Sequence, residues 1–160
     1  MDTAFTSPAP TSIPPYREAL PPEMEIRCRI LVWCAAWGSV NGTFRTTGLR
    51  DIAGPGHIHM ASGVGPDTTV SVSLDAYAAF WSSRLTESYA DWTLIADGPI
   101  GVHMHNGMAA ADFSSRLHGT TRTGQRMEQR QRVLQVWEKV ERDWRLTQEQ
   151  TQVNGERIAL

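Results

Sequence analysis

Apolar side chains recur at helical spacing over residues 22–40, the first strongly patterned part of the chain. Apolar positions at i, i+4, i+7 and i+11 mark one face of a helix, and here they are Ile26, Ile30, Trp33 and Trp37. Pro22 suits the first turn of a helix, and Asn41-Gly42 is a typical stop. The pattern therefore predicts a long, mostly covered helix from Pro22 to Val40.

Two shorter helices and one strand are predicted after it. Residues 49–53 suit a short helix that ends at Gly54-Pro55-Gly56, and residues 57–61 suit a short strand. A loop rich in glycine and proline follows. Ser73 is then placed to cap a third helix that ends near Leu85.

The second half of the chain has the pattern of antiparallel strands. Residues 92–96 and 100–105 are predicted to form one strand with a bulge between them. Asn106-Gly107 is a strong hairpin signal, because both residues accept the positive φ angles of a tight turn. Further strands are predicted over residues 108–118, 126–140 and 144–153. Helices followed by a meander of strands indicate an α+β fold.

Composition narrows the class of protein. The formal net charge is −2, which gives no reason to expect a nucleic-acid partner. No apolar run is long enough to span a bilayer, so we expect no membrane partner. Cys28 and Cys34 lie on one apolar helix, too far apart to bridge each other, and we expect buried thiols in a reduced, cytoplasmic protein. With Lys139 as the single lysine, in a predicted turn, Schiff-base chemistry is disfavoured.

The chain divides into three parts. Residues 1–22 hold six of the nine prolines and few charges, which predicts an extended or disordered arm. Residues 23–153 form the predicted domain, and residues 154–160 the predicted C-terminal tail.

Several short motifs, in this order and spacing, resemble those of one family. They are Leu74-Asp75-Ala76-Tyr77, Asn106-Gly107-Met108-Ala109, the stretch from Arg132 to Lys139, and Asp143-Trp144-Arg145-Leu146. The chain resembles SnoaL-like proteins of the nuclear transport factor 2-like superfamily, which includes ketosteroid isomerase and scytalone dehydratase. The resemblance implies a strongly bent antiparallel sheet wrapped around the N-terminal helices as a cone, with one mostly apolar pocket. It also implies a homodimer or homotrimer.

The resemblance implies roles for particular residues. In such relatives the general base ends the strand after the second helix, which is where His59 lies, with His105 or Asp112 as its partner in proton transfer. Arg132 matches a strand arginine of the family, and together with Gln148 it would polarise a substrate oxygen. The helices that line the pocket would hold an aromatic ring with Trp33, Trp37, Tyr77 and Trp81. Many relatives carry histidines on the last strand where this chain has glutamines, so a mechanism based on those histidines is in doubt.

These features indicate an enzyme that needs no cofactor. It would use general acid/base catalysis on a small aromatic or polycyclic hydroxy or carbonyl compound. As a lyase or isomerase it would carry out dehydration, isomerisation, cyclisation or retro-aldol cleavage. The last of these includes the deformylation of lignin-derived diarylpropanes, which some relatives catalyse.

Two alternatives from other classes stay open. The pairs His57/His59 and His103/His105 each project to one face of a strand, and four imidazoles could bind zinc or iron in a metal-dependent enzyme. The second alternative is a binding or association module without catalysis, since fold alone does not assign chemistry. Asp112 adds a further ambiguity, because alternation lets only one of Asp112 and Phe113 face the pocket.

Overall fold

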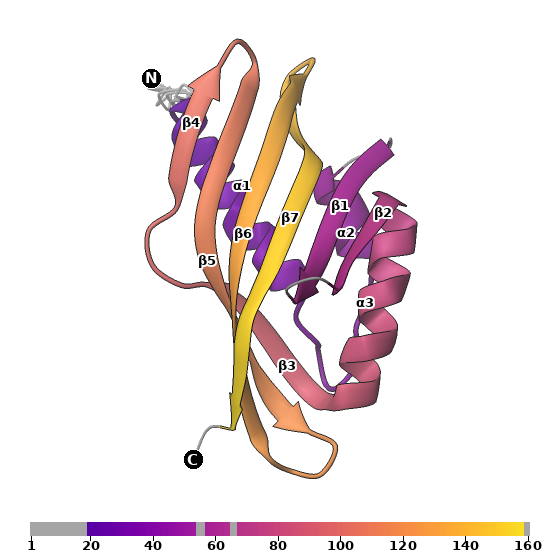
Figure 1. The fold of residues 1–160 in the computed structure, drawn as a ribbon. Coiled ribbons are helices and arrows are strands. Elements are labelled where there is room, and N and C mark those ends of the chain that lie inside the picture. Colours follow the sequence, from indigo (N-terminus) through magenta and orange to yellow (C-terminus); the bar gives the residue numbers. More distant parts are fainter. Residues whose placement is uncertain (1–18, 54–56, 65–66, 159–160) are drawn as a thin grey trace, which may run out of the picture.

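The computed structural model describes residues 19–53, 57–64 and 67–158, and the side chains of residues 57–72 and 155–158 lie outside this description. The elements follow in the order α1 (Pro22–Ala36), α2 (Thr47–Ala53), β1 (His57–Val64), β2 (Asp67–Ser73), α3 (Leu74–Ser88), β3 (Tyr89–Ala96), β4 (Gly101–His105), β5 (Met108–Thr121), β6 (Arg126–Val140) and β7 (Asp143–Ile158). Figure 1 shows the long strands β5, β6 and β7 curving in front of α1, with α3 beside β2.

One sheet holds all the described strands. Its order is β2-β1-β7-β6-β5-β3, and β4 also pairs with β5. β1 runs parallel to β7, while the other pairs are antiparallel. The α+β fold with helices inside a bent sheet is therefore confirmed. No helix in the described part of the chain has the length and apolar character that crossing a membrane would require.

The hydrophobic core lies between α1 and the concave face of the sheet. Ile26 and Ile30 are fully buried on the inner face of α1, and Trp137 of β6 is fully buried on the sheet. Buried and exposed positions alternate along β6, because successive side chains of a strand point to opposite faces. This alternation gives the sheet an inner face that can line a pocket.

Several predicted boundaries need correction. The strand predicted across residues 92–105 is two strands, β3 and β4, which pair with the second and first halves of β5. No strand was predicted between the loop at residues 63–67 and Ser73, where β2 lies, and α1 ends at Ala36, four residues before Val40. β7 continues to Ile158, so part of the predicted tail is strand. The predicted arm falls largely on residues 1–18, outside the described residues, and stays a prediction.

Two local predictions are confirmed. β6 has the predicted bounds. The hairpin between β4 and β5 turns at Asn106 and Gly107, with φ angles of 43° and 76°. Positive φ at both central residues is the geometry of a type I′ turn, whose twist matches that of the strands it joins.

Candidate active site

A pocket opens between α1, α3 and the inner face of the sheet. Its lining is apolar and aromatic apart from a few polar groups, and comprises Trp33, Cys34, Trp37, Tyr77, Trp81, Leu85, Leu94, Phe113, Ser115, Leu117, Gln131, Val133, Glu149 and Thr151. Trp81 and Leu94 are only half-buried, whereas the other lining residues are buried. The enclosed space measures about 40 Å³, enough for a few water molecules. A ring needs more room than this, so side chains of the wall have to move before one can bind.

The four aromatic residues predicted to hold a ring all lie in this wall. Trp33 lies on α1 and Trp37 caps the C-terminal end of that helix one turn later, with ring centroids 5.7 Å apart and the rings nearly perpendicular. The ring of Tyr77 on α3 is nearly perpendicular to that of Trp37, with centroids 5.4 Å apart, and Trp81 follows one turn later with its ring centroid 6.4 Å from that of Tyr77. Their location agrees with the prediction, and their part in binding stays a prediction.

The one charged side chain among the described lining residues is Glu149 of β7. A bulge on β7 turns it inward. Trp137 of β6 pairs with Leu146, but the next residue back, Val136, pairs with Gln148, so β7 carries one extra residue at Thr147. An extra residue shifts every later side chain to the opposite face of the sheet. Glu149 is consequently buried, at 5% exposure, and Gln148 is exposed.

Hydrogen bonds reach both oxygens of the Glu149 carboxyl group. Trp33 Nε1 and Gln135 Nε2 donate to Oε2 at 2.7 and 2.6 Å. The hydroxyl groups of Tyr77 and Thr151 donate to Oε1 at 2.8 and 3.4 Å. Because a carboxylate can accept at both oxygens, these donors compensate part of the loss of water around it.

The two oxygens differ in what their partners can do. An indole N–H can only donate, and Trp137 Nε1 donates to Gln135 Oε1 at 3.0 Å, which directs the Gln135 amide N–H₂ toward Glu149. Oε2 therefore meets two groups that only donate, and a proton there would clash with both. The hydroxyl partners of Oε1 can accept as well as donate. A proton on the Glu149 carboxyl group is therefore better accommodated at Oε1 than at Oε2.

Burial shifts the pKa values of three titratable groups in the pocket wall, those of Glu149, Tyr77 and Cys34. Burial raises the pKa of the Glu149 carboxyl group above its ordinary value, and the hydrogen bonds from Gln135, Tyr77, Trp33 and Thr151 lower it in part. Burial, with the neighbouring Glu149 charge, also places the pKa of Tyr77 well above its ordinary value. The same two causes raise the pKa of the Cys34 thiol to about 12. Tyr77 and Cys34 therefore stay protonated at neutral pH, and Glu149 is the group that can gain or lose a proton.

The raised pKa of Glu149 makes stability depend on pH. Between the ordinary carboxyl value and the higher folded value, the folded state binds more protons than the unfolded state, so the free energy of unfolding falls as pH rises. Glu149→Gln cannot titrate, and we expect its stability relative to wild type to improve steadily with pH across this window. Urea denaturation of both proteins at several pH values measures this difference. A difference that is constant with pH would contradict the raised pKa.

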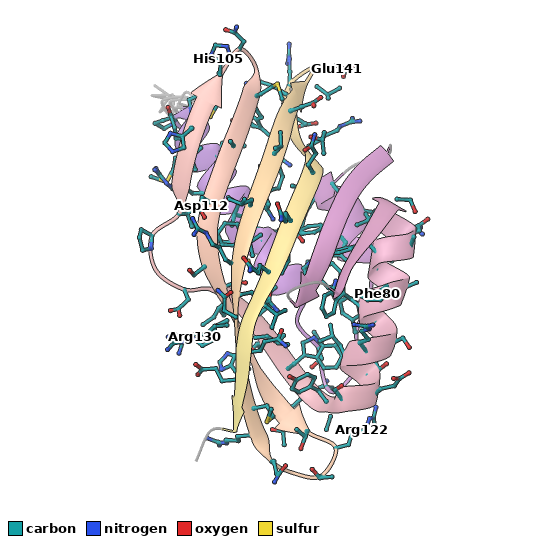
Figure 2. All side chains as sticks on the ribbon, in the orientation of Figure 1. Phe80, His105, Asp112, Arg122, Arg130 and Glu141 are labelled. Atoms are coloured by element: carbon teal, nitrogen blue, oxygen red, sulfur yellow. The ribbon has the colours of Figure 1, made fainter. Side chains whose placement is uncertain are left out.

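Four other predicted site residues lie away from the pocket lining. Figure 2 shows His105 at the hairpin end of β4 and Asp112 on β5, on the side of the sheet far from α3. Arg132 is exposed and forms an ion pair with Asp112 at 2.9 Å, across neighbouring strands of the outer face. Phe113 lines the pocket, so alternation places Asp112 outside. Asp112, Arg132, His105 and Gln148 therefore lie outside the described pocket lining, and of the two alternatives at residues 112 and 113 it is Phe113 that faces the pocket.

The side chain of His59 lies outside the described residues, so its predicted role as the base stays a prediction. The backbone of β1 pairs His59 with Gln148 and Met60 with Glu149. His103 and His105 are on β4, and β5, β6 and β7 separate that strand from β1. Four strand spacings amount to about 19 Å along the sheet, which does not favour one metal site made by both histidine pairs. Among the described residues, no three His, Cys, Asp or Glu side chains are close enough together to hold a metal ion.

Cys28 also departs from its prediction. Cys34 is buried in the pocket wall as expected, but Cys28 is on the exposed side of α1.

Comparison with known proteins supports the fold. No protein-family model matches the chain, and no curated protein matches its sequence. A nuclear transport factor 2-like superfamily protein from Salmonella enterica is 18% identical, with a TM-score of 0.60 over 81% of this chain and 87% of its own. A candidate aromatic ring hydroxylase from Novosphingobium aromaticivorans is 13% identical, with a TM-score of 0.64 over 86% of this chain and 92% of its own.

A third solved structure belongs to an enzyme. Hexachlorocyclohexane dehydrochlorinase LinA-type3 from Novosphingobium barchaimii is 8% identical, with a TM-score of 0.60 over 86% of this chain and 87% of its own. At these identities the likeness establishes the fold, which is nuclear transport factor 2-like, and leaves the chemistry to the site itself.

Proposed function

We propose that this protein is an enzyme without a cofactor, of lyase or isomerase type, in which Glu149 transfers a proton on a small aromatic or polycyclic hydroxy or carbonyl compound. The observation that carries the proposal is the buried Glu149 carboxyl group in an aromatic pocket, with one oxygen held by pure donors and the other by two hydroxyl groups that can also accept. A carboxyl group with a raised pKa in a pocket is the usual form of a general acid or base.

The geometry supports separate roles for the two carboxyl oxygens of Glu149 and for the indole of Trp81. Glu149 Oε1 would take a proton from a C–H or O–H group of the substrate, while Oε2 remains held by Trp33 and Gln135. The buried indole N–H of Trp81 makes no hydrogen bond of regular geometry in the described part of the chain, although it lies close enough to the Tyr77 hydroxyl to lower the pKa of that group, and it could donate to a substrate oxygen. Dehydration, isomerisation, cyclisation and retro-aldol cleavage all begin with such a proton transfer. Elimination of hydrogen chloride, the reaction in the name of one structural neighbour, begins in the same way.

A product screen tests the proposal. The full chain, treated with a chelator, is incubated with phenolic, diaryl, polyketide-like and chlorinated ring compounds, and masses are followed by liquid chromatography. We expect a new product that forms without added metal, and its mass distinguishes loss of water, formaldehyde or hydrogen chloride from isomerisation. Turnover that returns only with zinc or iron would overturn the proposal. Tight binding without conversion of any compound would instead support a binding module.

A further inference from the structure

The pocket holds one carboxyl group, Glu149, beside which no described cation lies. Glu149 takes part in none of the ion pairs of the described residues, and no arginine or lysine is among the described lining. The adjoining segment, residues 57–73, contains no arginine or lysine in its sequence, so β1 and β2 cannot supply one. Burying an unpaired carboxylate is costly, and a cation placed beside it would recover much of that cost.

The walls of the pocket suit the same kind of ligand. Five aromatic rings line it, those of Trp33, Trp37, Tyr77, Trp81 and Phe113. The face of an aromatic ring is electronegative and attracts ammonium groups, most strongly for tryptophan and more strongly where water is excluded. A pocket lined by aromatic rings and holding one carboxyl group is chemically complementary to a positive charge with an apolar body. It is unfavourable for an anion.

We infer that the pocket selects ring compounds that carry a protonated or quaternary amine over neutral and anionic compounds of the same shape. This inference rests on the proposed function in taking the pocket as the substrate site, and it narrows the substrate class to cationic amines. The amine would lie near Glu149 and against the tryptophan faces, with the ring in the apolar part of the pocket.

The charge state of the pocket depends on few groups. From α1 the titratable neighbour is Cys34 and from α3 it is Tyr77, and both stay neutral well above neutral pH. β7 supplies Glu149 itself. β1 carries His57 and His59, whose side chains lie outside the described residues. A fixed cation should therefore bind more tightly as pH rises and Glu149 loses its proton.

A matched set of three ligands tests the inference by isothermal titration calorimetry. One is a para-hydroxyphenethyl trimethylammonium ion, whose charge does not titrate. The second is its carbon isostere with a tert-butyl group, and the third is the corresponding phenylpropionate. At a pH of about 8 we expect the cation to bind about tenfold more tightly than its isostere, and the carboxylate to bind most weakly.

Variants test whether Glu149 causes the preference for the cation. Glu149→Gln should reduce the advantage of the cation to within about threefold, whereas Asp112→Asn, which removes an exposed carboxylate, should leave it unchanged. Because the histidines of β1 would also weaken cation binding at low pH, the double variant His57→Gln with His59→Gln separates their effect. It should retain both the preference and its rise with pH. Should Glu149→Gln fail to fold, that rise with pH in the double variant carries the test.

The two proposals can fail separately. If the carbon isostere binds wild type as tightly as the cation, the inference is wrong even where neutral compounds are turned over. If the cation is preferred but no compound of any class is converted, the inference stands and the proposed function fails.

Discussion

Glu149→Gln is expected to lower turnover at least about a hundredfold on whichever compound the screen identifies, because general acid/base catalysis by one group is worth about 10²–10⁴. The fold should persist. The glutamine oxygen can accept from Trp33 and Gln135 in place of Oε2, and its amide can donate to the hydroxyl groups of Tyr77 and Thr151. The measurement is kcat and KM from initial rates over a range of substrate concentrations, with circular dichroism to verify folding. We expect the loss in kcat.

Matched controls separate this role from general effects of charge. Asp112→Asn makes the same chemical change on the exposed outer face, where the carboxylate pairs with Arg132, and should leave kcat within about twofold because exposed pairs contribute little. His59→Ala tests the competing base. A hundredfold loss in His59→Ala, together with near wild-type turnover in Glu149→Gln, would transfer the role of base from Glu149 to His59.

The sequence is sufficient for much of the fold because the periodicities are clear. Helical spacing in α1 and strict alternation in β6 each fix which side chains face the core, and Asn106-Gly107 fixes the hairpin between β4 and β5. The division between β3 and β4 was not predictable in the same way. Both strands pair with β5, and only the tertiary arrangement shows that the chain changes position at Asp97–Ile100.

The aromatic residues of the pocket were predictable from the sequence, whereas Glu149 was not. The aromatic residues follow from the helix faces, since Trp33 and Trp37 fall on the same stripe as the buried isoleucines of α1. Glu149 was missed because simple alternation from Leu146 places Gln148 inside, and the bulge at Thr147 reverses that order. The sequence nevertheless held an indication of this shift in register. Continuing the alternation after Gln148 would bury a run of glutamines, whereas the shifted register buries Glu149, Thr151 and Val153.

The position of Arg132 shows a second limit of prediction from the sequence. Its resemblance to a family arginine suggested a role inside the pocket, but strand parity places it outside once Val133 faces in. There it pairs with Asp112, another residue predicted to be catalytic. Two residues that the sequence offered as site candidates thus pair with each other on the exposed face. An exposed ion pair is a common role for charged residues on a sheet face.

Trp137→Ala should cause the largest loss of stability, about 3–5 kcal/mol in the free energy of unfolding, because it removes a large buried aromatic side chain. Trp137 is fully buried between Ala109 and Leu146, and its N–H is the donor that orients Gln135 toward Glu149. The variant therefore opens a cavity and also leaves the Gln135 carbonyl without its partner, which adds to the cost.

Urea denaturation followed by circular dichroism measures the effect, and Leu134→Ala is the matched control. Leu134 lies three residues earlier on the same strand but on the outer face, at 45% exposure, so its truncation should cost less than about 1 kcal/mol. Trp137→Phe adds a second comparison, since it keeps a six-membered aromatic ring but removes the N–H donor together with part of the buried volume. It should fall between the other two in stability while still lowering turnover, because Gln135 is then free to turn its amide away from Glu149. Equal losses in Trp137→Ala and Leu134→Ala would mean that the inner face of β6 is not the core that positions the site.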